Sequence, residues 1–406
     1  MSSPRRTQFI LIFFTILLST IGFGVCIPVL PLYAQRYAAT NVENGLLTGV
    51  FSLMVVIASP LWGRLSDRIG RRPVLIISVL GSAAGYVIMG MGHSLAMLFV
   101  GRIIDGASGG NVSTAQAYIA DITRPEERSR AMGMIGAAFG LGFVIGPALG
   151  GYLAVIDASA PFFAVGVLCL LNALLVYTCL PESLPMERRH ESIRQPISAV
   201  LAHSDSALYL TTASAYLVNL TAFAIMTQVF ALFANHRFGM DEVGVGHIMA
   251  AIGIVGVVMQ GAVVRRLLPV LGEVIMARSG FVCLLVSFVL LPLVRYDWTL
   301  YTVSCLIAVG NSLVQPTLNG LASQSVSASW QGSALGFMQS AGSMGRFMGA
   351  VFGGWLLSFD EGMPHYGRTP FWVAAALMVL TLGLSTRLRA PRMKEEVAVS
   401  PASPGT

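Results

Sequence analysis

The chain has 406 residues, of which 55% are hydrophobic and only 11% are charged, and its mean hydropathy is +0.74. A soluble domain carries about 25% charged residues, so this composition excludes an ordinary soluble protein and indicates a protein embedded in a bilayer. The net charge of +6 does not indicate nucleic-acid binding, because the arginines fall in alternate loops between apolar segments. The five cysteines lie within apolar segments without paired spacing, which predicts small core side chains rather than disulfides or a metal site.

Twelve apolar segments are long enough to cross a bilayer as helices, which takes about 20 residues each. Lipid offers the backbone no hydrogen-bond partners, so each segment is expected to be α-helical. The first follows Arg5 and Arg6, and its length favours an uncleaved span over a signal peptide. The predicted spans are residues 9–34, 45–64, 73–92, 95–119, 130–153, 161–180, 208–233, 244–267, 272–294, 297–322, 332–357 and 369–387.

Basic residues are distributed unequally between the two sets of connecting segments. Nineteen Lys and Arg residues fall on the side of the N-terminus, whereas the opposite loops hold four, namely Arg36, Arg237, Arg295 and Arg368. Cytoplasmic loops of membrane proteins carry the excess of positive charge. The asymmetry therefore predicts that both termini are cytoplasmic.

The second and third spans are joined by the short charged segment 63–72. Gly63 and Gly70 permit a tight turn, and this segment also holds Asp67 and four arginines, Arg64, Arg68, Arg71 and Arg72. Taken alone, the segment is equally well explained as a positive-inside anchor. A second acid, Asp121, closes the fourth span on the same side of the membrane, which favours a functional contact between the two.

The fourth span contains Arg102 and Asp105, which lie three residues apart and hence on one helix face. Ionisable groups within a membrane are costly and usually functional. A carboxylate beside an arginine in a partly wet cavity can exchange a proton if substrate or conformation weakens the pair. A permanent structural ion pair is the alternative.

The fifth span carries a stripe of glycines, Gly142, Gly146 and Gly150, with Gly151 beside it and Pro147 within it. Glycines four residues apart let the backbone of another helix approach closely. We expect a helix-packing seam here, bent at the proline.

The polar stretch from Pro181 to Ser206 divides the chain. The predicted domains are residues 1–180, a six-helix bundle; 181–207, a central cytoplasmic loop; 208–390, a second six-helix bundle; and 391–406, a polar tail. The two halves echo each other with a shift of 203 residues, since the four glycines of the fifth span reappear as Gly345, Gly349, Gly353 and Gly354. A parallel repeat of this kind is typical of secondary transporters.

The second half is poor in charge but rich in amides. We expect its cavity to be lined by polar and apolar side chains that suit an amphipathic ligand, although about half of such amides serve only to join helices. Arg346 in the eleventh span either attracts an anionic group or bonds to backbone carbonyls. The candidate cavity residues are Phe223, Met226, Gln228, Asn311, Gln315, Asn319 and Arg346.

Nearly the whole chain resembles the major facilitator superfamily of secondary transporters. Segment 63–72 is similar to the signature loop between helices 2 and 3 of that family, where the matching acid and arginines form a cytoplasmic latch with the acid ending the fourth span. The resemblance assigns that role to Asp67, Arg68, Arg71 and Asp121, without deciding which arginine meets which acid. Arg102 matches an arginine linked in the family to proton transfer, and 142–151 resembles the motif of its antiporters.

Residues 22–31 and 139–142 resemble the twelve-span drug:proton antiporters, in particular the tetracycline-efflux branch. Two departures weaken tetracycline itself as the substrate. Ser19 stands where those pumps carry an aspartate in the first span, and residues 279–294 contain no carboxylate. The acids serve a metal–tetracycline cation, so a different amphipathic molecule is expected.

The predicted fold is therefore an all-α polytopic membrane protein with twelve helices in two bundles. The predicted function is export of small amphipathic molecules in exchange for protons, by a monomer in the bacterial inner membrane. We expect no enzymatic activity, no metal, no cofactor apart from the proton gradient, and no nucleic-acid partner. Two alternatives stay open: a facilitator or symporter for a metabolite or organic anion, and a membrane scaffold or sensor without transport activity.

Overall fold

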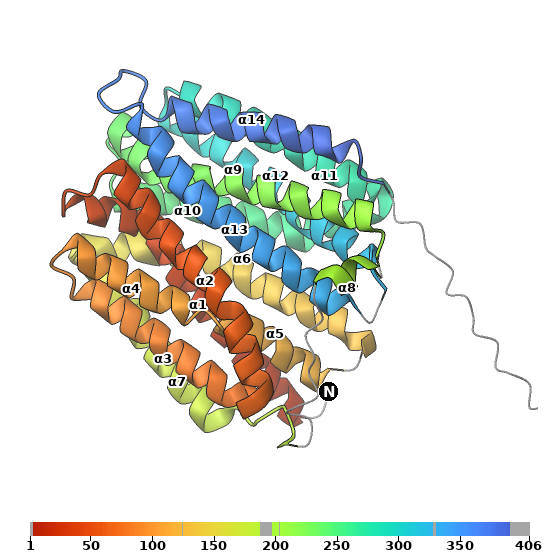
Figure 1. The fold of residues 1–406 in the computed structure, drawn as a ribbon. Coiled ribbons are helices and arrows are strands. Elements are labelled where there is room, and N and C mark those ends of the chain that lie inside the picture. Colours follow the sequence, from red (N-terminus) through yellow and green to blue (C-terminus); the bar gives the residue numbers. More distant parts are fainter. Residues whose placement is uncertain (1–2, 124, 187–196, 203, 328–329, 390–406) are drawn as a thin grey trace, which may run out of the picture.

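The computed structural model describes residues 3–123, 125–186, 197–202, 204–327 and 330–389, with backbone alone for 3–6, 125–137, 197 and 332. Within these ranges the regular structure is helical (Figure 1). The helices are α1 Ser3–Gln35, α2 Asn41–Ile69, α3 Arg71–Gly90, α4 Leu95–Ala107, α5 Asn111–Ile122, α6 Pro125–Ile156, α7 Ala160–Cys179, α8 Ile197–Ala202, α9 Ser206–Phe238, α10 Glu242–Val258, α11 Arg265–Leu290, α12 Asp297–Gln324, α13 Gln331–Ser358 and α14 Arg368–Ser385. A π-helical turn, Met259–Val264, joins α10 to α11, and a 3₁₀ turn, Leu291–Leu293, follows α11.

Each predicted span overlaps a helix, and the fourth overlaps two, α4 and α5. Eight helical stretches in the described ranges are long and apolar enough to cross a membrane, and one of them, Glu242–Leu293, contains two predicted spans. These two are separated at Gly272, where the backbone leaves the helical region with φ 72° and ψ 164°. The α4–α5 pair, α12 and α13 account for the remaining spans. The prediction of an all-α membrane fold is confirmed.

Two hydrophobic cores follow the two halves of the chain. One is built from buried side chains between Phe9 and Leu180, and the other from side chains between Val200 and Leu388 together with Leu32. In Figure 1 the red-to-yellow helices of the first half lie below the green-to-blue helices of the second. The halves meet where α2 packs against α13 and where α6 packs against α10.

The glycine stripe of α6 packs against α1. A Cβ atom added to Gly146 would lie 2.7 Å from the carbonyl oxygen of Ile21, and one added to Gly150 would lie 3.0 Å from that of Val25. The adjacent Gly151 faces the other half instead, since its Cβ would lie 2.6 Å from the carbonyl oxygen of Glu242 in α10. One helix therefore carries a seam within its own half and a contact between the halves.

The second half repeats this arrangement with α13. A Cβ on Gly345 would lie 2.7 Å from the carbonyl oxygen of Leu217 in α9, so this glycine belongs to a seam within the half. A Cβ on Gly354 would lie 2.9 Å from the Cα of Gly45 in α2, which places this glycine between the halves. The shift of 203 residues read from the sequence thus relates helices with equivalent neighbours.

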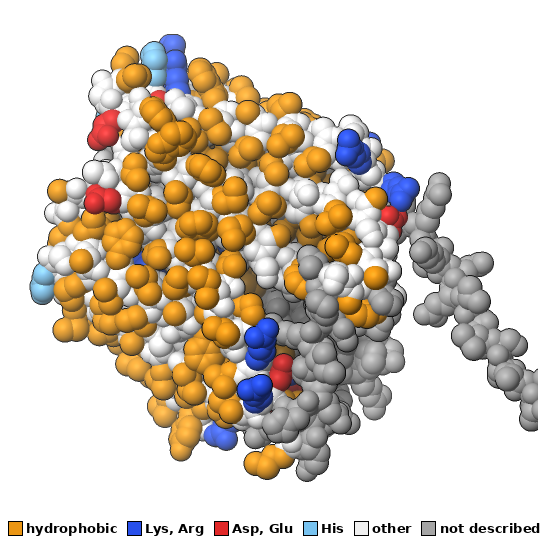
Figure 2. All heavy atoms as spheres, in the orientation of Figure 1, with side chains coloured by type: hydrophobic (Ala, Val, Ile, Leu, Met, Phe, Trp, Pro, Cys, Tyr) orange, Lys and Arg blue, Asp and Glu red, His pale blue; other side chains and the backbone are white. Residues whose placement is uncertain are grey.

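The bundle has two chemically different ends. We call the end that holds residues 63–72, 121 and 182–184 the basic end, and the end that holds residues 36–45, 151–157 and 360–368 the opposite end. Figure 2 shows hydrophobic side chains over the middle of the visible face, with charged side chains mostly toward its margins. Such a belt matches a chain surrounded by lipid at mid-height.

Candidate functional site

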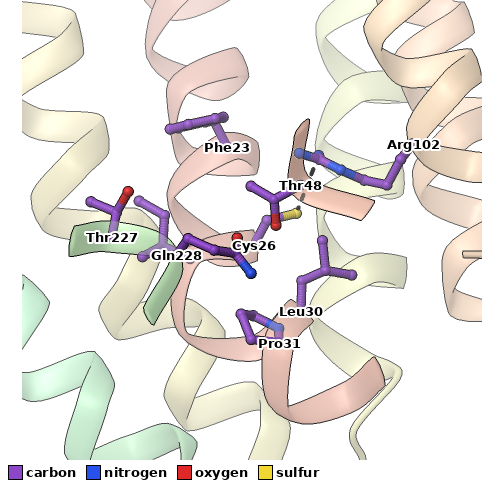
Figure 3. A pocket seen from close by; sticks show the side chains of 9 residues that line it. Phe23, Cys26, Leu30, Pro31, Thr48, Arg102, Thr227 and Gln228 are labelled. Atoms are coloured by element: carbon purple, nitrogen blue, oxygen red, sulfur yellow. Dashed lines mark hydrogen bonds between the residues drawn. The ribbon is translucent and has the colours of Figure 1, made fainter. Parts of the chain in front are cut away.

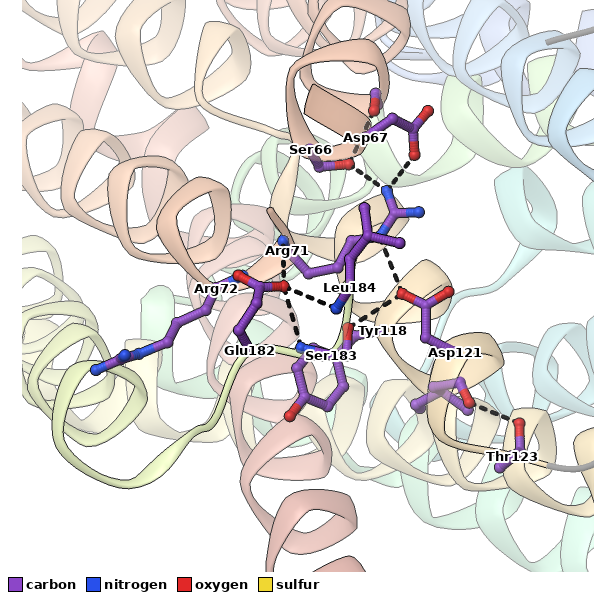
Figure 4. A network of polar contacts seen from close by, with 12 residues as sticks. Ser66, Asp67, Arg71, Arg72, Tyr118, Asp121, Thr123, Glu182, Ser183 and Leu184 are labelled. Carbon is purple, nitrogen blue, oxygen red and sulfur yellow. Dashed lines mark hydrogen bonds and ion pairs between the residues drawn. The ribbon is translucent and has the colours of Figure 1, made fainter. Parts of the chain in front are cut away.

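At the basic end, Arg71 is the centre of a polar cluster formed by Asp67, Arg71 and Asp121, which we call the latch cluster (Figure 4). Its Nη1 lies 2.5 Å from Oδ1 of Asp67, and its Nε lies 3.1 Å from Oδ2 of Asp121. The Arg71 side chain is 9% exposed, so its pair with Asp67 is largely shielded from water, whereas Asp121 is partly exposed. The structure thus selects Arg71 as the arginine that meets both acids.

The other residues of segment 63–72 lie in different positions. Arg68 is exposed, and Arg72 donates to the carbonyl oxygen of Tyr177. Gly63 is buried, and Gly70 has φ 107°, a conformation that favours glycine and lets the chain turn between α2 and α3. The turn brings the side chain of Arg71, at the start of α3, to that of Asp67, near the end of α2.

Glu182 completes this end of the bundle, although sequence reasoning did not single it out. Its carboxylate accepts hydrogen bonds from the backbone N–H groups of Arg71 (2.8 Å) and Arg72 (3.2 Å), and so satisfies the first turn of α3. Ser183 donates to Asp121 at 3.0 Å. The signal was available, because a Pro-Glu-Ser sequence directly follows the sixth span, but only the fold brings it to α3.

The fourth predicted span is broken between α4 and α5 at Ser108, Gly109 and Gly110, which corrects the expectation of one continuous helix. The break frees backbone carbonyl groups that would otherwise accept helical hydrogen bonds. Trp62 Nε1 donates to the carbonyl of Ala107 at 2.6 Å, and the Ser78 hydroxyl donates to that of Ser108 at 2.5 Å. Neighbouring helices therefore supply the partners that lipid cannot.

Arg102 and Asp105 lie on the last two turns before this break. Nη1 of Arg102 is 3.4 Å from Oδ2 of Asp105, and the two side chains are 1% and 6% exposed. Arg102 also contacts the Cys26 sulfur at 3.7 Å and the face of Phe51, whose centroid is 4.3 Å from the guanidinium carbon. Its Nε is buried without a hydrogen-bond partner among the described residues. The side chains of Ser82 and Tyr86 also hydrogen-bond to the Asp105 carboxylate, so the acid of this buried pair has other partners than Arg102.

A small cavity of about 40 Å³ lies between Arg102 and the second half (Figure 3). A cavity of this size has room for a few water molecules and is well below the about 300–1,000 Å³ of sites for small organic ligands. Asp105 is not among the lining residues, so the arginine stands between the carboxylate and the cavity. The lining residues are Phe23, Cys26, Ile27, Leu30, Pro31, Thr48, Arg102, Thr227 and Gln228.

Gln228 is the buried polar group that the second half contributes to this cavity. It is 3% exposed, and neither its amide nitrogen nor its amide oxygen has a hydrogen-bond partner in the part of the chain that the structure describes. A buried amide without partners is costly, because the lost hydration is not replaced. A ligand or water in the cavity would satisfy it.

The other two candidate residues of α9, Met226 and Phe223, contact the hydrophobic core of the second half. Met226 is 1% exposed, belongs to the hydrophobic core of the second half and is not among the residues that line this cavity. The helix turns it away from the direction that Gln228 faces, since two residues correspond to about 200° of rotation. Phe223 is half-buried and packs against the same core.

Two of the remaining candidates, Gln315 and Asn319, belong to a polar cluster around Tyr216 of α9. The Tyr216 hydroxyl donates to Oε1 of Gln315 at 3.4 Å, and the side chains of Asn319 and Gln339 also hydrogen-bond to it. Arg346 of α13 donates to the Ser343 hydroxyl at 2.7 Å. Asn311 is half-buried on α12, and its amide oxygen has no partner among the described residues.

Ser19, which replaces the acid expected in the first span, also has a partner. Its hydroxyl accepts a hydrogen bond from Nδ2 of Asn111 at 2.7 Å, directly after the break in the fourth span. A neutral hydroxyl–amide contact therefore occupies this position.

Known proteins with related sequences are named for drug resistance. The family model described as Major Facilitator Superfamily matches residues 12–350. The class D tetracycline resistance protein of Salmonella ordonez is 30% identical over 382 residues, covering 92% of this chain and 95% of that protein. Multidrug resistance protein 2 of Bacillus subtilis (strain 168) is 31% identical over 392 residues, with coverage of 94% and 95%.

A solved structure gives the same fold. The crystal structure of the human organic anion transporter MFSD10 (TETRAN) superposes with a TM-score of 0.74, covering 95% of this chain and 100% of that chain at 26% identity. With the paired bundles, the broken fourth span and the family match in agreement, the chain belongs to the Major Facilitator Superfamily and is a multi-pass membrane transporter rather than an enzyme.

Proposed function

We propose that this transporter exports small amphipathic molecules in exchange for protons. The observation that carries the proposal is the Arg102–Asp105 pair, because it is the only buried ion pair at mid-span among the described residues and its arginine lines the cavity between the halves. Buried ionisable groups of this kind mark proton relays in transporters. The two similar relatives named for drug resistance support export as the direction.

Proton binding at Asp105 would change the charge that the cavity meets. With Asp105 ionised, the Arg102 charge is compensated at 3.4 Å. Protonation removes the compensation and leaves the guanidinium facing the cavity with free donors. The two bundles rock around the midplane, so a change of charge between them would affect the side of the membrane to which the cavity opens. Proton transfer would thereby be coupled to transport.

The orientation proposed here places the basic end in the cytoplasm of a bacterial cell, in line with the excess of positive charge. The latch cluster then controls opening toward the cytoplasm, and the protein works as a monomer in the inner membrane. Loss of the two acids found in tetracycline pumps favours an amphipathic substrate other than a metal–tetracycline cation.

Asp105→Asn tests the proposal. In inverted vesicles with a pH gradient, the substitution is expected to abolish proton-driven accumulation of a substrate drug found by susceptibility screening. Gradient-free counterflow of the same drug should persist, because it needs no net proton transfer. Asp157→Asn serves as the matched control, since that acid lies in a loop at the opposite end and bonds to Ser159.

Unchanged gradient-driven transport in the Asn variant would reject Asp105 as the proton carrier. Loss of both gradient-driven transport and counterflow, together with a lower melting temperature, would show a structural ion pair instead. A facilitator or symporter of an organic anion is the second candidate, favoured by Arg346 and by the organic anion transporter of the same fold. A pH gradient that draws substrate along with protons would identify a symporter.

A further inference from the structure

We propose that the transported molecules carry an anionic group and that Arg346 is the residue that selects it. This inference rests on the proposed function for the presence of a substrate cavity, but not on the direction of transport or on proton coupling. It concerns Arg346 in the second half of the protein, whereas the Arg102–Asp105 pair lies in the first half.

The charge balance at mid-span is the first argument. Arg102 has its acid at 3.4 Å, whereas no carboxylate lies within 4 Å of Arg346 among the residues that the structure describes. The charges of Arg102, Asp105 and Arg346 therefore sum to +1, and the uncompensated positive charge is that of Arg346. A cation entering this region would be repelled, and an anion would supply the missing partner.

The position of Arg346 on α13 is the second argument. Gly345 and Gly349 of this helix face α9, while Phe347 and Val351 lie against Gly49 of α2. Arg346 falls between these two faces, about 180° from the exposed Trp355, which lies on the outer surface. The side chain therefore points between the two halves rather than into lipid.

Some residues of α13 between Arg346 and the basic end are exposed. Gln339, two turns earlier on nearly the same stripe of α13, is exposed. A Cβ atom on Gly336, one turn further toward this end, would meet no atom within 4 Å. Arg346 itself is only partly buried, although it lies mid-way along a membrane-spanning helix.

The neutral groups around Arg346 complete a site for an anion. The Tyr216 hydroxyl and the amides of Gln315, Asn319 and Gln339 form one hydrogen-bonded cluster, and each amide can turn its N–H₂ group toward an acceptor. Guanidinium and amide donors together match a planar carboxylate, which accepts through two oxygens.

Binding to the purified, full-length protein in detergent tests the inference. The probes are 1-naphthaleneacetate, its neutral amide 1-naphthaleneacetamide and the cation 2-(1-naphthyl)ethylamine, together with the same three forms of several other arylalkyl scaffolds. Among scaffolds that bind, the carboxylate is expected to have a Kd at least tenfold lower than the amide or the amine. Arg346→Gln should reduce this preference to within about twofold.

Arg278→Gln is the matched control, because that arginine donates to the carbonyl of Ser385 between α11 and α14 and should not affect the preference. If Arg346→Gln does not fold, Arg346→Lys takes its place and should lower the preference, since an ammonium cannot make the paired contacts of a guanidinium. A preference for the amine, no preference, no binding by any scaffold, or an unchanged preference in the Arg346 variant would overturn the inference.

Equilibrium binding in detergent involves no proton gradient. A carboxylate preference without proton-driven export would therefore refute the proposed function and leave the inference standing. Proton-driven export of substrates without any charge preference would support the proposed function and refute the inference about Arg346.

Discussion

At the scale of single residues, Arg71 shows how one side chain joins three elements. It follows the turn at Gly70, pairs with Asp67 at the end of α2 and pairs with Asp121 at the end of α5. The Ser66 hydroxyl accepts a further hydrogen bond from it at 2.6 Å. Because Arg71 is nearly buried, removing it would leave two carboxylates without their common partner.

Arg71→Ala is therefore expected to destabilise the protein far more than Arg68→Ala. Breaking a buried ion pair costs about 3–5 kcal/mol, and the partial exposure of Asp121 reduces our expectation to about 2 kcal/mol. The exposed Arg68 should contribute within about 0.5 kcal/mol. Thermal melting in one detergent compares the two variants, and equal shifts would contradict the assignment of Arg71 to the centre of the latch cluster.

At the scale of helices, α6 and α13 are the elements that the internal repeat makes equivalent. Each carries a glycine seam toward the first helix of its own half and one glycine toward the other half. Pro147 of α6 has Ala350 as its counterpart, so the two helices share packing but not the bend-prone residue. The glycine positions, rather than the proline, therefore define the repeated unit.

Gly146→Ala tests the seam between α6 and α1. The added methyl group would lie 2.7 Å from the carbonyl oxygen of Ile21 and 2.9 Å from the Cα of Gly24, so the helices must separate. Overpacking of this kind costs about 1–3 kcal/mol. Gly140→Ala on the same helix meets only the Val257 side chain at 3.4 Å and is the control. Similar melting temperatures for the two variants would refute the close approach.

The break between α4 and α5 is the element that periodicity missed. Residues 95–119 are uniformly apolar enough for one helix, and a Gly-Gly pair alone does not force an interruption. The interruption persists because Trp62 and Ser78 satisfy the freed carbonyls, and those partners come from α2 and α3. A contact made across helices cannot be read from the span itself.

At the scale of the whole molecule, the two halves are in close contact at the opposite end. Gly45 of α2 lies against Ala350 and Gly354 of α13, and Gly151 of α6 lies against α10. Arg36 and Glu242 form an ion pair at 3.4 Å, but the arginine is 54% exposed, so that pair contributes little. Close backbone packing is thus the main contact that must separate if this end opens.

One hydrogen bond between the halves is insensitive to ordinary changes of pH. The Tyr366 hydroxyl, in the loop after α13, donates to Oδ1 of Asn41 at 3.4 Å. Burial raises the pKa of Tyr366 to about 12, so the hydroxyl stays protonated and keeps its donor below that pH. This contact would be lost only as the pH rises through about 12.

Gly45→Ala is expected to shift the protein away from the state closed at the opposite end. Its methyl group would lie 2.6 Å from the carbonyl oxygen of Ala350, so the halves must move apart. Hydrogen–deuterium exchange should then increase in peptides covering residues 41–49 and 350–358. Gly383→Ala, which meets no atom within 4 Å, and Arg36→Gln should leave these peptides unchanged. Equal uptake in all variants would contradict a glycine-packed gate.

The sequence alone determined the membrane class, the helical spans apart from the break in the fourth, the repeat and the family, because all of these follow from composition and local spacing. Length and hydropathy suffice for a helix that lipid surrounds. The division into two bundles at residues 181–207 stays a prediction, although the two hydrophobic cores separate in the same region.

Only the tertiary structure decided which side chains meet. It chose Arg71 over Arg68 for Asp121, brought Glu182 to the start of α3, and turned Met226 into the core while Gln228 reached the cavity. The physical reason is that a hydrogen bond or ion pair depends on distances of about 3 Å between groups far apart in the chain. Those distances are set by how the helices rotate and cross, which the periodicity of a single helix does not specify.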